Sequence, residues 1–212
     1  MKRILFQGDS ITDCRHDREN DRYPGSGYST IVAGRLSVTN PGEYEILNRG
    51  ISGNRIVDLF ARIKKDCINL NPDIVSILIG INGIWHEISE QNGVDAEKYE
   101  KVYDMIMSEL SSSLPNTRFI ILEPFVMYGS VTCPTDEHPD RWEIYQRETP
   151  IRARIAKHIA DKYEATFIPL QSVFEEACAK APSTYWLVDG VHPTVYGHGL
   201  IAEEWIKHSG IK

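Results

Sequence analysis

The sequence predicts an α/β protein with an open parallel sheet covered by helices on both faces. Five short apolar runs are spread along the 212 residues, and amphipathic stretches separate them. The runs are continuously apolar rather than alternating, which is typical of strands that are covered on both faces. Strands and helices that alternate along a chain form parallel sheets with right-handed crossover connections.

Each strand and helix is placed by its pattern of apolar residues. Strands are expected at 3–7, 44–47, 73–79, 117–122 and 165–170. Apolar residues three and four positions apart predict helices at 28–36, 56–67, 97–114, 150–163, 171–179 and 193–208. The fourth and the sixth of these helices begin with Pro150 and Pro193, and proline suits the first helical position.

The stretch 129–149 interrupts this alternation. It contains Pro134, Pro139 and many charged residues, so we expect a long irregular connection after the fourth strand. Connections of this length are usually functional or mobile. We expect this one to lie at the rim of a site or at a subunit contact.

The composition is that of an ordinary globular protein, with 42% apolar and 25% charged residues. We find no internal repeat, linker or low-complexity segment, so residues 1–212 are expected to form a single domain. The formal net charge of −7 disfavours nucleic acid and anionic membranes as partners, because the chain has no basic patch to neutralise phosphates.

The four cysteines are widely spaced and form no CxxC pair, which predicts free thiols in a reducing compartment. They are Cys14, Cys67, Cys133 and Cys178. No long apolar segment follows the N-terminus as in a signal peptide, and no run reaches the ~20 apolar residues of a membrane span. We therefore expect a cytoplasmic protein.

A serine stands directly after the first expected strand, in the tetrapeptide Gly8-Asp9-Ser10-Ile11. In α/β proteins, ligands bind outside the carboxyl ends of the strands, so Ser10 is placed where a nucleophile would be. Glycine, aspartate and serine are also ordinary turn residues, and the tetrapeptide alone fits a plain turn as well. Asp13 and Arg15 follow closely enough to border a pocket beside Ser10.

An aspartate and a histidine stand three residues apart just before the last expected helix, in Asp189-Gly190-Val191-His192-Pro193. An aspartate at this spacing can reach the imidazole Nδ1–H, fix the tautomer and stabilise the imidazolium. The other ring nitrogen is then free to take a proton from a serine hydroxyl. The alternative is an aspartate that caps the helix and a histidine exposed to solvent.

Two further loops, 48–54 and 80–83, follow the second and third strands. Acyl transfer needs donors aimed at the developing oxyanion, and Gly53 can present its backbone N–H while Asn82 can present its side-chain amide. Each loop alone fits a strand-to-helix turn. Together, the loops after the strands supply a serine, an Asp–His pair, a glycine and an asparagine, which is the set that acyl transfer requires.

The blocks Gly8-Asp9-Ser10-Ile11, Gly50…Gly53-Asn54, Gly80-Ile81-Asn82 and Asp189-x-x-His192 resemble the SGNH (GDSL) hydrolase family, in its order and over essentially the whole chain. Within it, the stretches 8–12, 50–54 and 80–85 are most similar to small bacterial acetyl xylan esterases and carbohydrate O-deacetylases. The resemblance implies a three-layer α/β/α sandwich with a five-stranded, flavodoxin-like sheet of order 2-1-3-4-5. Homo-oligomers are common among these relatives, so a homo-oligomer is possible here.

The resemblance also implies the role of each site residue. Ser10 would be the nucleophile, His192 the general base and acid, and Asp189 its orienting partner. The oxyanion would be held by the backbone N–H groups of Ser10 and Gly53 and by the side chain of Asn82.

The third block departs from the family pattern at one position. The family usually has Gly-x-Asn-Asp, and this chain has Gly83 in place of the second Asp. A carboxylate there can brace its loop, so we expect the glycine to loosen the loop that carries Asn82. On this reasoning Gly83→Asp leaves activity equal or higher.

Three residues next to the site loops are candidate substrate contacts: Asp9, Trp85 and Trp186. Aromatic rings at the rim of a site suit the apolar faces of sugars or an acyl chain. The alternatives are core packing for the two tryptophans and a capping role for Asp9. The remaining histidines form no metal-ligand cluster, so we expect no metal and no cofactor.

The sequence thus predicts a metal-independent serine esterase that hydrolyses short acetyl esters through a Ser-His-Asp acyl-enzyme mechanism. Its expected partner is a small-molecule ester or an acetylated saccharide. One alternative is a lysophospholipase or thioesterase for longer acyl chains. Another is a weakly active or silent carbohydrate-binding relative, which Gly83 favours. A nucleotide-binding module is a third, but no Gly-rich phosphate loop opens a helix.

Overall fold

A five-stranded parallel sheet forms the centre of the protein in the computed structural model, which describes residues 1–211. Its strand order is β2-β1-β3-β4-β5, and each neighbouring pair is parallel. The strands are β1 (Lys2–Gly8), β2 (Tyr44–Asn48), β3 (Ile74–Leu78), β4 (Arg118–Leu122) and β5 (Thr166–Ile168). The predicted fold class and strand order are confirmed, and each strand lies within two residues of its expected start.

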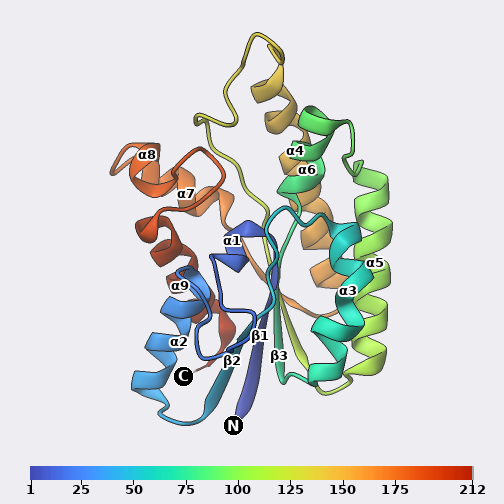
Figure 1. Ribbon diagram of the computed structural model, residues 1–212, viewed down its shortest axis with the longest axis vertical. Helices are drawn as coiled ribbons and strands as arrows, with labels where there is room; N and C mark the ends of the chain where they lie inside the picture. The colour runs from blue at the N-terminus through green and yellow to red at the C-terminus, as the bar shows by residue number, and fades with distance from the viewer. Residues whose placement is uncertain (212) are drawn as a thin grey trace.

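Helices cover both faces of this sheet (Figure 1). On one face lie α2 (Tyr28–Thr39), α7 (Gln171–Cys178) and α9 (Val195–Ser209), and on the other lie α3 (Ile56–Asp66), α5 (Ala96–Ser113) and α6 (Arg141–Lys162). Shorter helical segments are α1 (Ser10–Asp13), η1 (Ile68–Leu70), α4 (Ile81–Glu90) and α8 (Ser183–Trp186).

Side chains of β1 alternate between the two faces, so each face has its own core. Phe6 packs edge-on against Tyr28 of α2 and beside Trp205 of α9. The neighbouring Leu5 belongs to the core on the opposite face. All four side chains are fully buried, and each such burial contributes roughly 1.5–3 kcal/mol. A strand buried on both faces reads as a continuous apolar run, which explains why the runs predicted the strands.

Two helix boundaries differ from those that the sequence predicted. Helix α6 begins at Arg141, so Pro150 lies inside it and the second half of the stretch 129–149 is helical rather than irregular. A proline inside a helix removes one hydrogen bond at a cost of about 3 kcal/mol. Residues on either side of it, Tyr145, Ala153 and Ala156, are buried, and their packing offsets that loss.

The segment after β3 also differs, because α4 begins at Ile81 where a loop was expected. The other predicted helices are present with ends shifted by three residues at most. All four cysteines are free thiols. Within the described part of the chain, no helix combines the length and the apolar character that a membrane crossing requires.

Candidate active site

Ser10 lies just past the carboxyl end of β1, an inner strand of the sheet, at the first position of α1. Asp9 caps this short helix, because its carboxylate accepts the backbone N–H of Ile11 at 3.0 Å. At the other end of the turn, the carbonyl of Ser10 accepts the N–H of Cys14. The predicted turn is therefore real, and it fixes the backbone of Ser10 while leaving the side chain only half-buried.

His192 completes a chain of hydrogen bonds between Ser10 and Asp189. Its Nε2 lies 2.9 Å from the Oγ of Ser10, and its Nδ1 lies 2.7 Å from Oδ2 of Asp189. The other oxygen of Asp189 accepts the backbone N–H groups of Val191 and His192 at 2.9 and 2.8 Å. An ionised aspartate can only accept, so Nδ1 carries the ring proton and Nε2 is free to accept the serine hydroxyl.

The electrostatics of the pair support this arrangement. The hydrogen bond that His192 donates to Asp189 raises the pKa of His192, although partial burial opposes the shift. Burial alone would raise the pKa of Asp189, but the hydrogen bonds from His192 and Val191 outweigh it and lower that pKa. Asp189 therefore stays ionised wherever His192 is neutral, and its charge favours an imidazolium at His192.

The turn that carries Asp189 is held by a segment distant in sequence. After β4, the N–H of Met127 donates to the carbonyl of Gly190 at 2.9 Å, and the N–H of Val131 donates to the carbonyl of Asp189 at 3.1 Å. The hydroxyl of Thr132 holds this segment in shape, because it accepts the N–H of Gly129 at 2.8 Å and donates to the carbonyl of Met127 at 2.9 Å. We expected the connection after the fourth strand to lie at the rim of a site or at a subunit contact. Sequence reasoning missed the residues that hold the Asp189 turn, because their contribution is made by backbone atoms.

The two predicted oxyanion loops lie side by side. The side-chain amide of Asn82, in the first turn of α4, donates to the carbonyl of Asn54 at 3.1 Å, directly after Gly53. This contact uses one amide hydrogen and leaves the second available. Gly53 has a φ of +79°, a conformation that L side chains rarely adopt, so a glycine is needed to turn the backbone here.

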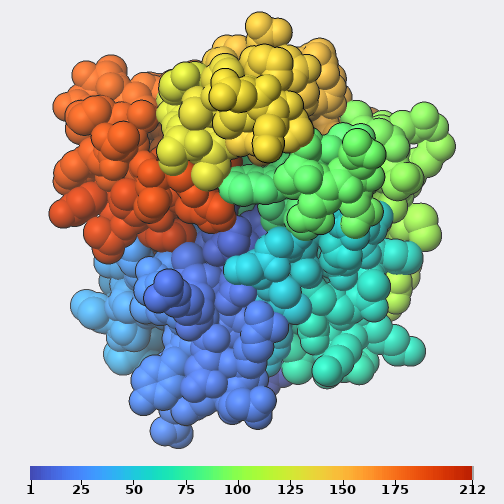
Figure 2. Space-filling view, turned by 45° about the horizontal axis from the view of Figure 1, so that its top comes forward, coloured from blue at the N-terminus to red at the C-terminus, as the bar shows by residue number. Residues whose placement is uncertain are grey.

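Four segments that are far apart in sequence thus come together at one end of the sheet. In Figure 2, the blue N-terminal part, the cyan and green middle parts and the orange-red C-terminal part meet on the same face. The structure places Ser10, His192 and Asp189 in direct contact, and it joins Asn82 to the Gly53 turn. A hydroxyl, a base, an ionised acid and backbone and amide donors are the components of an acyl-transfer site.

Comparison with known proteins bears directly on this geometry. The sequence profile of the GDSL-like lipase/acylhydrolase family matches residues 6–200. The chain belongs to this family. It is accordingly a carboxylic ester hydrolase.

Individual relatives span nearly the full length of this GDSL-family hydrolase. The acetylxylan esterase of Geobacillus stearothermophilus is 30% identical over 220 residues, which cover 100% of this chain and 95% of the relative. Its crystal structure superposes with a TM-score of 0.84. A protein from Parabacteroides merdae assigned to the GDSL-like lipases is 34% identical, with a TM-score of 0.92 and coverage of 100% and 96% of the two chains. Structures of the Geobacillus esterase include catalytic mutants in which a serine or an aspartate is replaced by alanine.

Gly83, where this hydrolase departs from the family pattern, lies in the first turn of α4 and not in a loop. It is buried, and its carbonyl accepts the N–H of Val94 at 3.0 Å. A Cβ at this position would lie 3.2 Å from the carbonyl oxygen of Val94. The segment is therefore a helical turn with the backbone of Val94 packed against the glycine, and the effect of Gly83 on the segment stays a prediction.

Asp9 directly precedes Ser10 and is buried, with 1% of its surface exposed. Burial raises its pKa to about 6, and its charge in turn raises the pKa of His192. So little exposure leaves no surface for a substrate to contact. The structure favours the capping alternative for Asp9 and adds an electrostatic effect on His192.

The two candidate rim tryptophans differ in their surroundings. Trp85 is half-buried and meets the His192 ring edge-on, with 6.0 Å between ring centroids. Trp186 is also half-buried, but its indole N–H is taken by the carbonyl of Ala177 at 3.0 Å. Trp85 is thus the one placed against His192.

Asp13, considered above as a border of the pocket, supports a loop instead. One of its oxygens accepts the N–H of Ser52 at 2.9 Å, and the other lies 3.0 Å from Nδ1 of His16. This buried carboxylate holds the Gly53 turn against α1. Arg15 is exposed.

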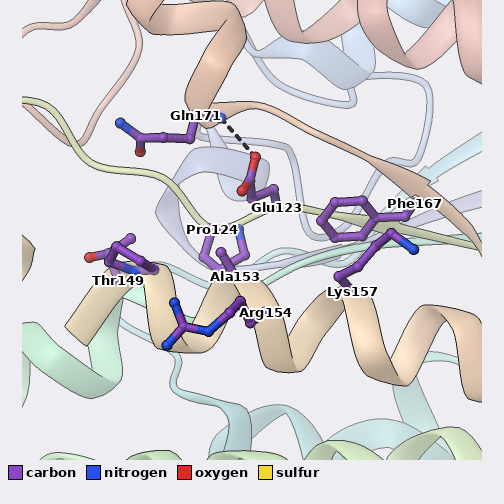
Figure 3. Close-up of a pocket in the computed structure, with 9 residues that line it drawn as sticks. Glu123, Pro124, Thr149, Ala153, Arg154, Lys157, Phe167 and Gln171 are labelled. Atoms are coloured by element: carbon purple, nitrogen blue, oxygen red, sulfur yellow. Dashed lines mark hydrogen bonds between the residues drawn. The ribbon is translucent and has the colours of Figure 1, made fainter. Parts of the chain in front are cut away.

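A cavity of about 410 Å³ lies between α6 and the ends of β4 and β5 (Figure 3). The carboxylate of Glu123 there accepts the backbone N–H of Gln171 at 2.9 Å. Neither Ser10 nor His192 lines this cavity, so it is separate from the site. Over residues 1–211, no group of three or more His, Cys, Asp or Glu side chains is arranged to hold a metal ion.

Proposed function

We propose that this protein is a serine esterase that removes acetyl groups from acetylated saccharides through a covalent acyl-enzyme. The observation that carries the proposal is the continuous chain of hydrogen bonds from Ser10 through His192 to Asp189. The acetylxylan esterase of Geobacillus stearothermophilus, 30% identical over the whole chain, supports acetyl esters of carbohydrate as the substrate class.

In the first half of the reaction, His192 takes the proton of Ser10 as Oγ attacks the ester carbonyl carbon. The carbonyl oxygen becomes an oxyanion, which the backbone N–H groups of Ser10 and Gly53 and the Asn82 amide stabilise. His192 then gives its proton to the departing sugar hydroxyl as the C–O bond breaks. The product is a saccharide alcohol and an acetylated Ser10.

In the second half, water replaces the sugar. His192 takes a proton from the water, whose oxygen attacks the acetyl carbon through a second oxyanion. Collapse of this intermediate releases acetate, and His192 returns the proton to Ser10 Oγ. Asp189 keeps its negative charge throughout and stabilises the imidazolium at both stages.

The choice of a short acyl group agrees with the surroundings of the nucleophile. A long acyl chain needs a pocket that buries most of its surface. The cavity in Figure 3 and a larger one of about 860 Å³ behind α4 are lined by other residues than Ser10 and His192. Neither therefore offers a channel for a long chain beside the nucleophile.

The test compares substrates on one enzyme. We expect acetylated xylo-oligosaccharides to lose acetyl groups, detected by mass, and p-nitrophenyl acetate to react faster than p-nitrophenyl octanoate. Ser10→Ala should abolish both activities. Faster octanoate hydrolysis would assign the site to longer acyl chains, and glycan binding without hydrolysis above the Ser10→Ala background would make the protein a silent binding relative.

A further inference from the structure

The first turn of α4 borders an open cavity on one side. This turn carries Asn82. Behind it, a cavity of about 860 Å³ separates α4 from α6, and its lining includes Gly83, Val94, Glu148 and Arg152. Because side chains do not fill this space, the position of the turn depends on the specific contacts that cross it.

Val94 provides the contact on the α4 side of this cavity. It lies in the connection between α4 and α5, which folds back so that its N–H donates to the carbonyl of Gly83 at 3.0 Å. Its Cβ and its carbonyl oxygen lie 3.4 and 3.2 Å from the point where a Gly83 side chain would begin. The backbone of Val94 therefore crowds the place where the usual aspartate of the family would begin.

Arg152 holds Val94 in this place from α6. Its Nη2 donates to the carbonyl of Val94 at 2.7 Å, while its Nη1 donates to the carboxylate of Glu148 at 2.8 Å and to the backbone carbonyl of Glu148 at 3.2 Å. The side chain is 3% exposed. A guanidinium is planar and rigid. Hydrogen bonds from Nη1 to Glu148 of α6 and from Nη2 to Val94 therefore fix the distance between α6 and Val94.

We propose that Arg152 is a positioning residue for Asn82, acting through the backbone of Val94 and Gly83. The proposal rests on the role of Asn82 as an oxyanion donor in the proposed function. Arg152 touches neither the substrate nor Ser10. It takes over, from a different helix, the bracing that the missing aspartate would give to the turn that carries Asn82.

The physical consequence of losing Arg152 is a misplaced amide donor. The buried carbonyl of Val94 would lose its charged donor, and the connection could relax into the cavity behind α4. The turn at Gly83 would follow, and with it the side chain of Asn82. Oxyanion stabilisation depends on where the donor stands, and a misplacement of about 1 Å can cost ~10²-fold in rate.

A double-mutant cycle tests this coupling in the full-length protein. The acylation rate is measured from the burst of p-nitrophenol released from p-nitrophenyl acetate, for wild type, Arg152→Met, Asn82→Ala and the double variant. We expect Asn82→Ala to lower the acylation rate by about 10²- to 10³-fold. We expect Arg152→Met to lower the acylation rate by about 10- to 100-fold when Asn82 is present, with KM unchanged. In the Asn82→Ala background, it should lower the acylation rate by less than about 3-fold.

Two further variants support the cycle. Arg154→Met makes the same substitution at an exposed arginine of the same helix and should leave the rate unchanged. Arg152→Lys keeps the charge but not the fork, so it should fall between wild type and Arg152→Met. If Arg152→Met does not fold, as judged by circular dichroism, Arg152→Lys takes its place in the cycle.

The possible failures are distinguishable. An equal loss in both backgrounds would show that Arg152 is merely structural and would overturn the proposal, as would a wild-type rate in Arg152→Met. A wild-type rate in Asn82→Ala alone would instead overturn the role of Asn82, on which the proposal rests. If the wild-type protein hydrolysed no ester at all, the proposed function itself would be contradicted.

Discussion

The hydroxyl oxygen of Ser10 and Nε2 of His192 lie 2.9 Å apart, although 182 positions of sequence separate them. Ser10 follows the inner strand β1, and His192 stands just before α9, which packs on that strand. The contact is therefore set by the core beneath it, through Phe6 and Trp205, as much as by the two loops. Changes that leave this core intact can test the chemistry without disturbing the fold.

Asp189→Asn should preserve the turn and remove the charge. An asparagine oxygen can still accept the N–H groups of Val191 and His192. Without the carboxylate, the imidazolium loses its stabilising partner and the tautomer is no longer fixed. We expect kcat for p-nitrophenyl acetate to fall by roughly 10⁴-fold with little change in melting temperature. A fall below 10-fold would show that Asp189 is not the partner that orients His192.

Asp9→Asn should shift the pH dependence of the reaction. Activity requires neutral His192, so it rises as the pH increases through the pKa of that residue. The buried carboxylate of Asp9, with a pKa of about 6, favours protonated His192 and raises the pKa of the imidazole. Asparagine keeps the cap on Ile11 but not the charge, so the acid limb of kcat/KM should move to lower pH.

The control for this profile is Asp17→Asn, at an exposed carboxylate that caps a surface turn. It should leave the acid limb where it is in the wild-type enzyme. A shift of the Asp9→Asn profile to higher pH, or none at all, would mean that the charge of Asp9 does not act on His192.

A side chain at Gly83 should reduce both stability and activity. The Cβ of Gly83→Ala would press on the Val94 carbonyl at 3.2 Å, and Gly83→Asp would add a buried carboxylate to the same strain. Overpacking of this kind costs about 1–3 kcal/mol. We expect a lower melting temperature and a lower kcat for both variants, the reverse of what the family pattern alone predicts.

The matched control is Gly34→Ala, on the exposed side of α2, where an added Cβ meets nothing within 4 Å. In an open helical position this change should stabilise the fold by roughly 0.5–1 kcal/mol. Higher activity in Gly83→Asp, with an unchanged melting temperature, would restore the interpretation that glycine weakens this segment.

Much of the fold was predictable because β1 and β3 are buried on both faces. A strand such as 3–7 then has no polar alternation, and its apolar run identifies it directly. The contact of Ser10 with His192 was expected from the resemblance to the SGNH family, because Ser10 follows a strand whereas His192 stands in the turn between α8 and α9.

Other parts of the site left no such pattern in the sequence. Met127 and Val131 hold the Asp189 turn with backbone N–H groups, which any residue except proline supplies. Pro150 predicted that a helix begins at that position. The helix instead begins at Arg141, because buried residues on both sides of Pro150 pack as parts of one helix. Arg152 is one of several arginines in α6, and only the folded structure shows that its guanidinium is buried against Val94.

The identity of the nucleophile is the central claim, and covalent labelling tests it most directly. The protein is treated with a fluorophosphonate probe, digested, and mapped by mass spectrometry, with Ser10→Ala treated in parallel. We predict one adduct per chain on Ser10, complete loss of p-nitrophenyl acetate hydrolysis on labelling, and no adduct on the Ser10→Ala protein. An adduct on another residue, or full hydrolysis by Ser10→Ala, would contradict the account.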